Sequence, residues 1–202
     1  MPRNTEAMKT TDGRHERSSS TRKQILAEGR ALIIAGISDP TAKQISESAG
    51  ITTRTLFRHF PDMATLLQTV MQQAQSQARA VMEEPFPNDL SPTEHWRELL
   101  QIVISRRTRA YESILPLHLS PTMQRHLATP KRNSLSKGIN RRRARLQQIL
   151  PEHLVENQLL FEALDATLSI EYWASLRVGQ GLSIAKATKV LGFSIERLTI
   201  GH

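Results

Sequence analysis

The 202-residue chain has no cysteine, and aromatic residues make up only 4% of it. The missing cysteines exclude disulfides, thiolate metal sites and a cysteine nucleophile, and they fit a reducing compartment. No apolar run approaches the roughly 18 residues of a membrane span, and the polar N-terminus lacks the apolar stretch of a secretory signal. We therefore expect a cytoplasmic protein that does not bind membranes.

Catalytic and metal-binding patterns are missing as well. The seven histidines are scattered without the spacing of a metal-binding pair. No glycine-rich phosphate loop and no nucleophile elbow occurs. The chain is therefore not predicted to be an enzyme, and no metal or cofactor is expected.

Apolar residues recur at helical spacing along most of the chain, and no segment alternates as a β-strand would. Helix starts are indicated by the capping pairs Thr21–Gln24 and Thr41–Gln44, by Thr52 and by Asp62. We predict an all-α fold of nine helices, over residues 21–36, 41–49, 52–60, 62–84, 91–114, 120–130, 131–150, 155–179 and 183–199. Residues 1–19, which are polar and mixed in charge, are expected to form a disordered arm.

The two short helices at 41–49 and 52–60 meet at Gly50, and the second carries threonines, arginines and a histidine opposite an apolar side. A tight glycine turn between two such helices is the sequence form of a helix-turn-helix. The net charge of +8 also favours a polyanionic partner. Double-stranded DNA is therefore the first partner expected, and the alternative is a solvated helix whose charges have no function.

The order Thr21-Arg22, Ile45 to Gly50, and Leu56-Phe57-Arg58-His59-Phe60-Pro61-Asp62 closely resembles the N-terminal domain of TetR-family transcriptional regulators. The resemblance implies a homodimer, usually a repressor, that binds a palindromic operator. It implies a helix-turn-helix DNA-binding domain at residues 20–67 and a ligand-binding and dimerisation domain at 68–202. It also implies that an unidentified small-molecule effector, bound among the C-terminal helices, controls the affinity for DNA.

The outer side of the helix at 52–60 holds most of the residues expected to contact DNA. We interpret Arg54 as the main reader of base edges, with Thr53 and Phe57 beside it, because arginine binds guanine and the other two can contact a thymine methyl. A phosphate contact or an ion pair is the alternative for Arg54. The resemblance implies phosphate contacts for Lys43, Thr55 and His59. The full expected set is Thr41, Lys43, Thr52, Thr53, Arg54, Thr55, Phe57, Arg58 and His59.

Three positions depart from the family pattern. Phe57 stands where the family usually has tyrosine, and Met63 stands where a lysine is common, so a phenolic hydroxyl and a positive charge are missing. Arg54 stands where a small residue is frequent, and it adds a cation. Because each charge contact with phosphate contributes roughly one unit to the log–log salt slope, we expect a flatter salt dependence and more reliance on Arg54.

Most of the positive charge lies outside this helix pair, because residues 71–155 carry thirteen Lys and Arg against seven Asp and Glu. A solvated face is the usual interpretation of such a charge run. Arg107 and Arg142 differ, since each falls on the apolar stripe of its helix and must pair, extend outward or await an anion. We hypothesise that one or both bind an anionic effector. The alternatives are an outward extension and a salt bridge with Glu112, Glu162 or Glu171.

Two further residue sets follow from position in the family plan. The expected ligand pocket is lined by Trp96, Val103, Arg107, Tyr111, Arg142, Phe161 and Tyr172. The expected dimer interface contains Trp173, Leu176, Val190, Leu191 and Leu198. Plain core packing is the alternative for the aromatic members. Two other functions stay open: a constitutive DNA-binding or bridging protein without an effector, and a helical module whose basic middle surface binds an acidic partner.

Overall fold

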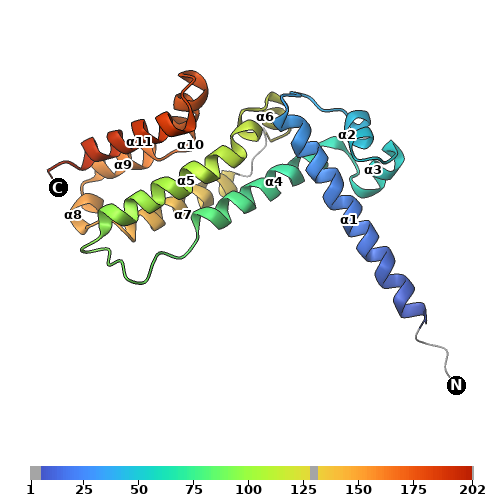
Figure 1. The fold of residues 1–202 in the computed structure, drawn as a ribbon, viewed down its shortest axis with the longest axis horizontal. Coiled ribbons are helices and arrows are strands. Elements are labelled where there is room, and N and C mark those ends of the chain that lie inside the picture. The colour runs from blue at the N-terminus through green and yellow to red at the C-terminus, as the bar shows by residue number, and fades with distance from the viewer. Residues whose placement is uncertain (1–5, 128–131, 202) are drawn as a thin grey trace. The chain divides into compact units, whose positions relative to one another are not determined.

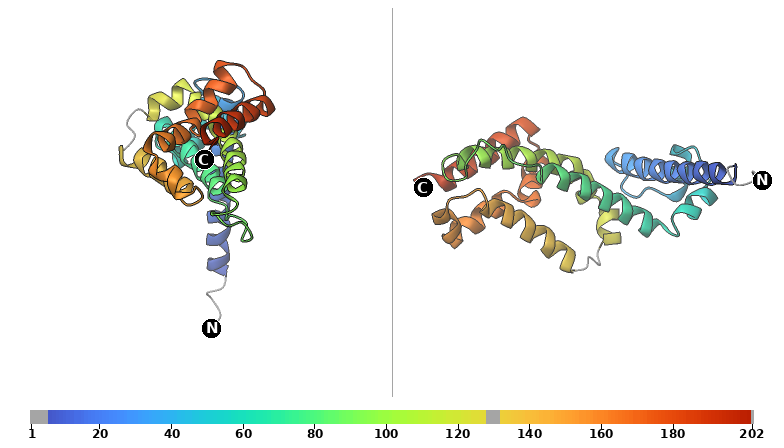
Figure 2. Two further views of the ribbon diagram at one scale, coloured as in Figure 1. Left: turned by 90° about the vertical axis from the view of Figure 1, so that its left-hand side faces the viewer. Right: turned by 90° about the horizontal axis from the view of Figure 1, so that it is seen from below.

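The computed structural model describes residues 6–127 and 132–201, and every regular element in these ranges is a helix (Figures 1 and 2). The elements in chain order are α1 (Glu6–Ile34), α2 (Ala42–Ser48), α3 (Thr53–His59), α4 (Met63–Met82), α5 (Trp96–Leu119), α6 (Pro121–Leu127), α7 (Arg132–Gln147), α8 (Glu152–Glu156), α9 (Gln158–Thr167), α10 (Ile170–Ala174), the π-helix η1 (Ser175–Gly179) and α11 (Ile184–Thr199). The all-α prediction is confirmed for the described residues.

The chain divides into two compact units. The N-terminal unit comprises Met1–Gln73 and Pro116–Ala128, and the C-terminal unit comprises Ala74–Leu115 and Thr129–His202. Helix α6 thus belongs to the N-terminal unit, whereas the sequence analysis places its residues in the C-terminal domain.

Polar contacts attach α6 to the segment between α1 and α2. Thr122 of α6 is completely buried and donates its hydroxyl hydrogen to the Ser38 carbonyl. A guanidinium nitrogen of Arg125 lies 3.0 Å from the Asp39 carboxylate. Because these partners are more than 80 residues apart in sequence, no local pattern could indicate them.

The core of the N-terminal unit uses one apolar side of each of its first four helices. Ile25 of α1, Ile45 of α2, Leu56 of α3 and Leu66 of α4 have no exposed surface, and neither does Phe60 at the end of α3. Burial of such side chains contributes about 1.5–3 kcal/mol each to folding. With this side of α3 inside the core, only its opposite side is available to a partner.

The C-terminal unit is built around α5. Its buried side chains pack with those of α7 to α11 in one apolar cluster that includes Trp96, Val103, Tyr111, Leu146, Phe161, Leu164, Trp173, Leu176 and Leu191. Helices α9 and α11 contact each other and lie side by side in Figure 1. Aromatic residues are few in this chain, and both of its tryptophans are used in this cluster.

The first helix begins earlier than the sequence predicts. Residues 1–5 lie outside the described part, but α1 starts at Glu6, so residues 6–19 are helical and the expected disorder there is wrong. Thr21 is not a helix cap, because its hydroxyl donates to the Arg17 carbonyl one turn earlier, 2.9 Å away. A threonine can make this bond inside a helix as readily as it caps one.

The expected single helix at 155–179 is broken into shorter elements. Asn157 accepts a hydrogen bond from the Leu160 amide and begins α9, and Ser169 accepts one from the Tyr172 amide and begins α10. Both residue types are preferred N-caps. Helix α5 also begins later than Ser91, at Trp96, because the Ser91 amide donates to the His95 ring 3.2 Å away and closes a turn.

Candidate DNA-binding interface

The turn between α2 and α3 is formed by caps and a glycine, as the sequence predicts. The Thr41 hydroxyl accepts from the Gln44 amide at 3.2 Å, and the Gln44 side chain accepts from the Thr41 amide at 2.9 Å, so the capping box is confirmed. Gly50 follows α2 with a positive φ of 63°. Thr52 then caps α3 by accepting from the Thr55 amide at 3.2 Å. The two helices are therefore joined by a short turn that is closed by hydrogen bonds at both helix ends.

Gly50 is expected to tolerate asparagine better than valine. Nothing lies within 4 Å of an added Cβ, so the effect of a substitution comes from the backbone alone. A left-handed φ disfavours most side chains by about 1–2 kcal/mol, whereas asparagine adopts it more readily. Urea unfolding of Gly50→Val should show a loss of about that size, and Gly50→Asn should lose less. Equal stability of the two variants would contradict this explanation.

The exposed side of α3 carries the side chains expected to read DNA. Thr53, Arg54 and Arg58 are exposed, and Phe57 keeps 43% of its surface exposed. Arg54, Phe57 and Arg58 are three and four residues apart, so they share one face of the helix. An exposed phenylalanine on a polar helix face is an available apolar contact for a base methyl.

Several of the other expected DNA contacts already have partners within the unit. The Thr55 and Thr52 hydroxyls are 3.0 Å apart, and the Thr41 hydroxyl contacts the Gln44 side chain at the same distance. The Lys43 ammonium lies 3.8 Å from Glu47, but 80% of the Lys43 side chain is exposed. Exposed pairs of this kind contribute about 0–1 kcal/mol, so Lys43 is free to move to a phosphate.

His59 differs from the other expected contacts because its ring is partly buried. Its Nε2 atom is inaccessible and has no hydrogen-bond partner among the residues that the structure describes. Burial, followed by the charges of Arg58 and Arg22, lowers the pKa of this imidazole below its usual value. At neutral pH the ring is therefore uncharged, and any phosphate contact by His59 would use an N–H group rather than a positive charge.

Two residues of α1 hold the helix-turn-helix in place, and the sequence analysis assigned neither of them this role. Arg22 donates to the His59 carbonyl at 2.7 Å and stacks over the Phe60 ring at 4.0 Å. Gln24 donates to the Ala49 carbonyl at 3.0 Å. Each side chain satisfies a carbonyl at the end of a helix, where no intrahelical donor is available. The local signal is that both precede Ile25, the first residue of α1 that is buried among the described side chains.

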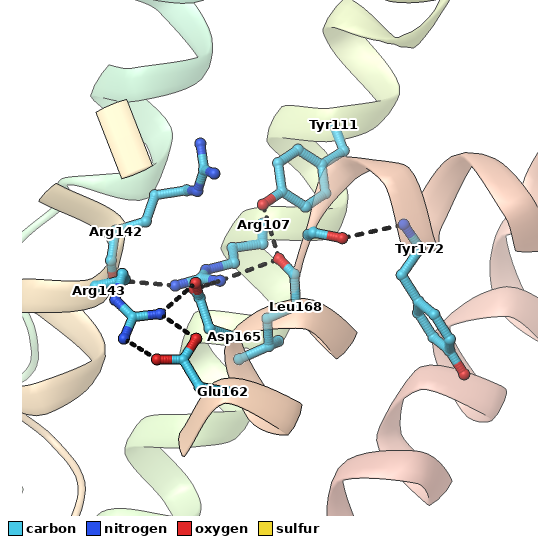
Figure 3. Close-up of polar contacts among 9 residues, drawn as sticks. Arg107, Tyr111, Arg142, Arg143, Glu162, Asp165, Leu168 and Tyr172 are labelled. Atoms are coloured by element: carbon cyan, nitrogen blue, oxygen red, sulfur yellow. Dashed lines mark hydrogen bonds and ion pairs between the residues drawn. The ribbon is translucent and has the colours of Figure 1, made fainter. Parts of the chain in front are cut away.

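The residues predicted for a ligand pocket lie in the C-terminal unit, and Figure 3 shows four of them, Arg107, Tyr111, Arg142 and Tyr172. The Arg107 side chain is buried and donates to the carbonyls of Leu168 at 3.0 Å and Arg142 at 3.2 Å. Its third contact is Asp165, at 4.0 Å. Tyr111, one helical turn along α5, donates to the same Leu168 carbonyl at 2.8 Å. Arg107 is therefore paired inside the core.

The expected glutamate partners of Arg107 are wrong. Glu112 instead accepts from Arg177 at 2.6 Å and from the Trp173 ring nitrogen at 2.9 Å. Glu162 accepts from Arg143 at 2.6 Å. In the tertiary structure these two carboxylates bind other arginines. Arg107 donates instead to two backbone carbonyls.

The remaining predicted pocket residues have two different surroundings. Trp96, Val103 and Phe161 are buried in the apolar cluster, in keeping with the core alternative. Tyr172 is partly buried, and its hydroxyl lies 3.0 Å from that of Ser194. None of these four side chains contacts Arg107 through a hydrogen bond or ion pair that the structure shows.

Much of the basic middle region stabilises the loop after α4. Arg106 donates to the carbonyls of Glu84 and Pro85 at 2.6 and 2.8 Å, and Arg145 also donates to the Glu84 carbonyl. The guanidinium groups of these two arginines lie 5.1 and 4.2 Å from the Phe86 ring. Only part of the charge run is therefore the solvated face that the sequence predicts. The proline-containing loop leaves backbone carbonyls without donors, and the planar guanidinium groups of arginine can donate to them.

The predicted dimer residues divide into buried and half-buried groups. Trp173, Leu176 and Leu191 are each at most 2% exposed within one chain, because they pack in its own core. Val190 and Leu198 are partly buried against that core. The first three therefore have almost no surface left for a second copy. An interface in this region would have to use more exposed apolar residues.

No group of three or more side chains suited to a metal ion occurs within the described ranges. Across the same residues, no helix has the length and apolar character needed to cross a bilayer.

Comparison with known proteins identifies the N-terminal helices. Residues 25–70 match the family model of bacterial regulatory proteins of the tetR family. No curated protein matches the chain. A solved structure of a TetR family protein from Vibrio parahaemolyticus is 15% identical in sequence to this chain. The match covers 90% of this chain and 88% of that chain, with a TM-score of 0.36. Residues 25–70 of this chain thus form a helix-turn-helix domain of the kind found in bacterial regulators of the tetR family.

Proposed function

We propose that this regulator binds a palindromic operator as a homodimer, represses transcription there, and is released by a small-molecule effector. The observation that carries the DNA-binding part is the two-sided character of α3. Leu56 and Phe60 are completely buried, while Arg54, Phe57 and Arg58 lie on the exposed side. An anchored short helix with such a face fits the major groove, where its first residues reach base edges.

Roles within the groove follow from side-chain chemistry. Arg54, near the start of α3, has a planar fork that can bind guanine O6 and N7 together. Phe57 lies on the same side and offers an apolar contact to a thymine methyl. Lys43 is exposed at the start of α2, where we assign it to phosphate. Base specificity would then depend mainly on Arg54 and Phe57, and Lys43 would contribute affinity without sequence preference.

The dimer is supported by apolar surface on α9 and α11. Leu159 is 85% exposed on α9, and Phe193 is 56% exposed on α11. Ile200, directly after α11, is 58% exposed. Because α9 and α11 contact each other, this surface belongs to one helix pair. A two-fold axis would pack the pair against its copy as a four-helix arrangement, which buries the same residues in both subunits.

The effector would act by changing the spacing of the two α3 helices. Dimeric readers contact successive major grooves about 34–36 Å apart, so a small change of spacing removes the fit to both half-sites. Helix α4 has residues in both units and ends at the loop held by Arg106 and Arg145. A ligand that moves this end of α4 would therefore be expected to alter DNA affinity.

Selection from a random duplex library tests the proposal, and Arg54→Ala is the informative variant. The wild-type protein should select a palindrome. Arg54→Ala should lose about 1–3 kcal/mol at one base position of each half-site and relax the preference there. Lys43→Ala is the matched control, which should weaken binding to all sequences alike and reduce the salt slope by about one. Uniform weakening by Arg54→Ala would make that residue a phosphate contact instead.

The helical-module alternative has little support from the middle region. Arg106, Arg143 and Arg145 are directed to acceptors of the same chain. Arg109 and Arg141 are more exposed, but they lie near Glu84 and Glu83, at 3.3 and 3.4 Å. A surface for acidic partners would need these cations to be available. The constitutive alternative predicts instead that no small molecule changes operator binding.

A further inference from the structure

We propose that Arg142 binds the carboxylate of a small amphiphilic monoanion, and, resting on the proposed function, that this anion is the effector. Of the two arginines that the sequence places on apolar stripes, the structure leaves only this one without a counter-charge. Arg107 has both terminal nitrogens engaged by carbonyls. Arg142 is therefore the candidate anchor for the ligand.

The Arg142 guanidinium has no partner among the residues that the structure describes. Its Nε atom is inaccessible to solvent and makes no hydrogen bond. Figure 3 shows the group directed away from Arg143, Glu162 and Asp165. The stretch 126–137, whose side chains lie outside the description, contains no Asp or Glu. That stretch cannot supply a carboxylate either.

Two carboxylates of this cluster are already used by other arginines, while Glu171, whose charge acts on Tyr111, makes no ion pair with the described residues. Arg143 binds Glu162 at 2.6 Å and Asp165 at 3.2 Å. Asp165 is also 4.0 Å from Arg107. Arg107 and Arg143 therefore share two carboxylates, and Arg142 binds neither of them. A partly buried cation without a counter-charge is unfavourable, so an anion bound at Arg142 would stabilise this cluster.

Tyr111 does not fill this role. Burial is the largest effect and raises the pKa of its hydroxyl; the charges of Arg107 and Arg142 lower this pKa, and those of Glu171 and Asp165 raise it, so all four groups are near the ring. The hydroxyl is therefore protonated at neutral pH, and its hydrogen is donated to the Leu168 carbonyl at 2.8 Å. A bound anion would supply the counter-charge that the described residues do not give Arg142.

The surroundings of Arg142 indicate the kind of anion. An arginine fork matches a carboxylate, which can accept two parallel hydrogen bonds. Ile139 and Leu146 flank Arg142 at helical spacing on α7, and Ile139 is 42% exposed whereas Leu146 is fully buried. An apolar body beside a single charge therefore fits better than a strongly hydrated inorganic anion. Because one guanidinium is available, a monoanion is favoured over a dianion.

Ligand binding is tested without DNA, by thermal unfolding and calorimetry. The ligands are linear carboxylates of increasing length, including octanoate, and the comparison probes are 1-octanol, octylamine and sodium sulfate. Carboxylates should raise the Tm and bind measurably, because a ligand of the native state stabilises it, whereas the alcohol, the amine and sulfate should not. Arg142→Gln should weaken octanoate binding at least tenfold. Arg142→Lys keeps the positive charge but loses the planar guanidinium, so its affinity for octanoate should lie between those of the wild type and Arg142→Gln. Failure of every carboxylate, or equal binding of the alcohol or sulfate, would overturn the proposal.

Arg141→Gln is the matched control, because it removes one positive charge at the adjacent position. The Arg141 side chain is 51% exposed and lies 3.4 Å from Glu83, so its loss should leave octanoate binding unchanged. Arg142→Gln alone should unfold at the same temperature as the wild type, since no pair is broken. Equal octanoate binding by Arg142→Gln, or a marked loss of its stability, would show that Arg142 is a structural residue.

The link to DNA is measured separately. Octanoate should weaken binding of the selected palindrome by the wild-type protein and not by Arg142→Gln. If the palindrome is bound but octanoate binds without releasing it, the effector role is overturned and DNA binding stands. If no palindrome is selected but Arg142-dependent octanoate binding is found, the proposed function fails while the anion site stands.

Discussion

Arg107→Met is expected to lower the free energy of unfolding by about 2–3 kcal/mol, because charge-assisted hydrogen bonds contribute about 1.5–3 kcal/mol each. The substitution removes the donors to the Leu168 and Arg142 carbonyls, which are 3.0 and 3.2 Å away. Leu168 keeps the Tyr111 hydroxyl as a donor, at 2.8 Å. The Arg142 carbonyl loses the hydrogen bond that the Arg107 side chain donates to it.

The opposing effect is the desolvation of a buried charge. Burial is the largest cause that lowers the pKa of Arg107, so the charged form is disfavoured at this position. Methionine has a similar volume and avoids this term, which is why the expected loss is below the roughly 3–5 kcal/mol seen when one member of a buried ion pair is removed. The acceptors left behind are uncharged carbonyls, apart from Asp165, which Arg143 still binds.

Urea unfolding followed by circular dichroism measures this prediction. Arg109→Met is the control, because its side chain is 59% exposed and its contact with Glu84 is 3.3 Å; exposed pairs contribute about 0–1 kcal/mol. A domain of this size should lose about 5–10 °C in Tm with Arg107→Met. If the two variants lose the same stability, the buried pairing of Arg107 does not stabilise the C-terminal unit.

Phe193→Glu is expected to convert the dimer to a folded monomer and to weaken operator binding by about 100-fold or more, since linked binding sites gain about 10²–10⁴ in avidity. Phe193 is 56% exposed, and the Arg197 guanidinium lies 5.0 Å from the centroid of its ring. A two-fold interface contains the same residue from both subunits, so the substitution changes both sides of the interface. It also places two carboxylates in an apolar surface, where unpaired charge is strongly disfavoured.

Light scattering after size exclusion measures the oligomeric state, and titration of a labelled palindrome measures affinity. Ile34→Glu is the control, because Ile34 is also exposed, at 51%, but belongs to α1 of the N-terminal unit. It should leave the dimer intact. A Phe193→Glu protein that remains dimeric would place the interface elsewhere, and a monomer that binds the palindrome with unchanged affinity would remove the need for a dimer.

The helix-turn-helix could be predicted closely because its defining contacts are local. The Thr41–Gln44 box and the Thr52 and Asp62 caps join residues three apart, and each is present. Such contacts follow from residue type and spacing. The same local rule was misleading at Thr21, where an equally suitable bond to Arg17 was available inside a longer helix.

The assignments of the arginines could not be predicted in this way. Arg107 is bonded to Leu168 and Arg142, which are 61 and 35 residues away. Arg22 reaches His59 across 37 residues. A periodic pattern shows that a cation falls on an apolar stripe, but the identity of its acceptor depends on which helices pack together. The apolar pattern of α11 likewise could not separate Leu191 in the core from Phe193 on the surface.

By itself, the sequence determined that the protein is all-α and has a two-helix DNA-reading unit, with Arg54 and Phe57 on the outer side of the second helix. Periodicity and capping are enough for this, because they act within one or two turns. Only the tertiary structure decided that Arg107 is paired, that Arg142 has no partner among the described residues, and that the exposed apolar surface of α11 includes Phe193. Counter-charges and burial are properties of packed helices, and a single helix does not specify them.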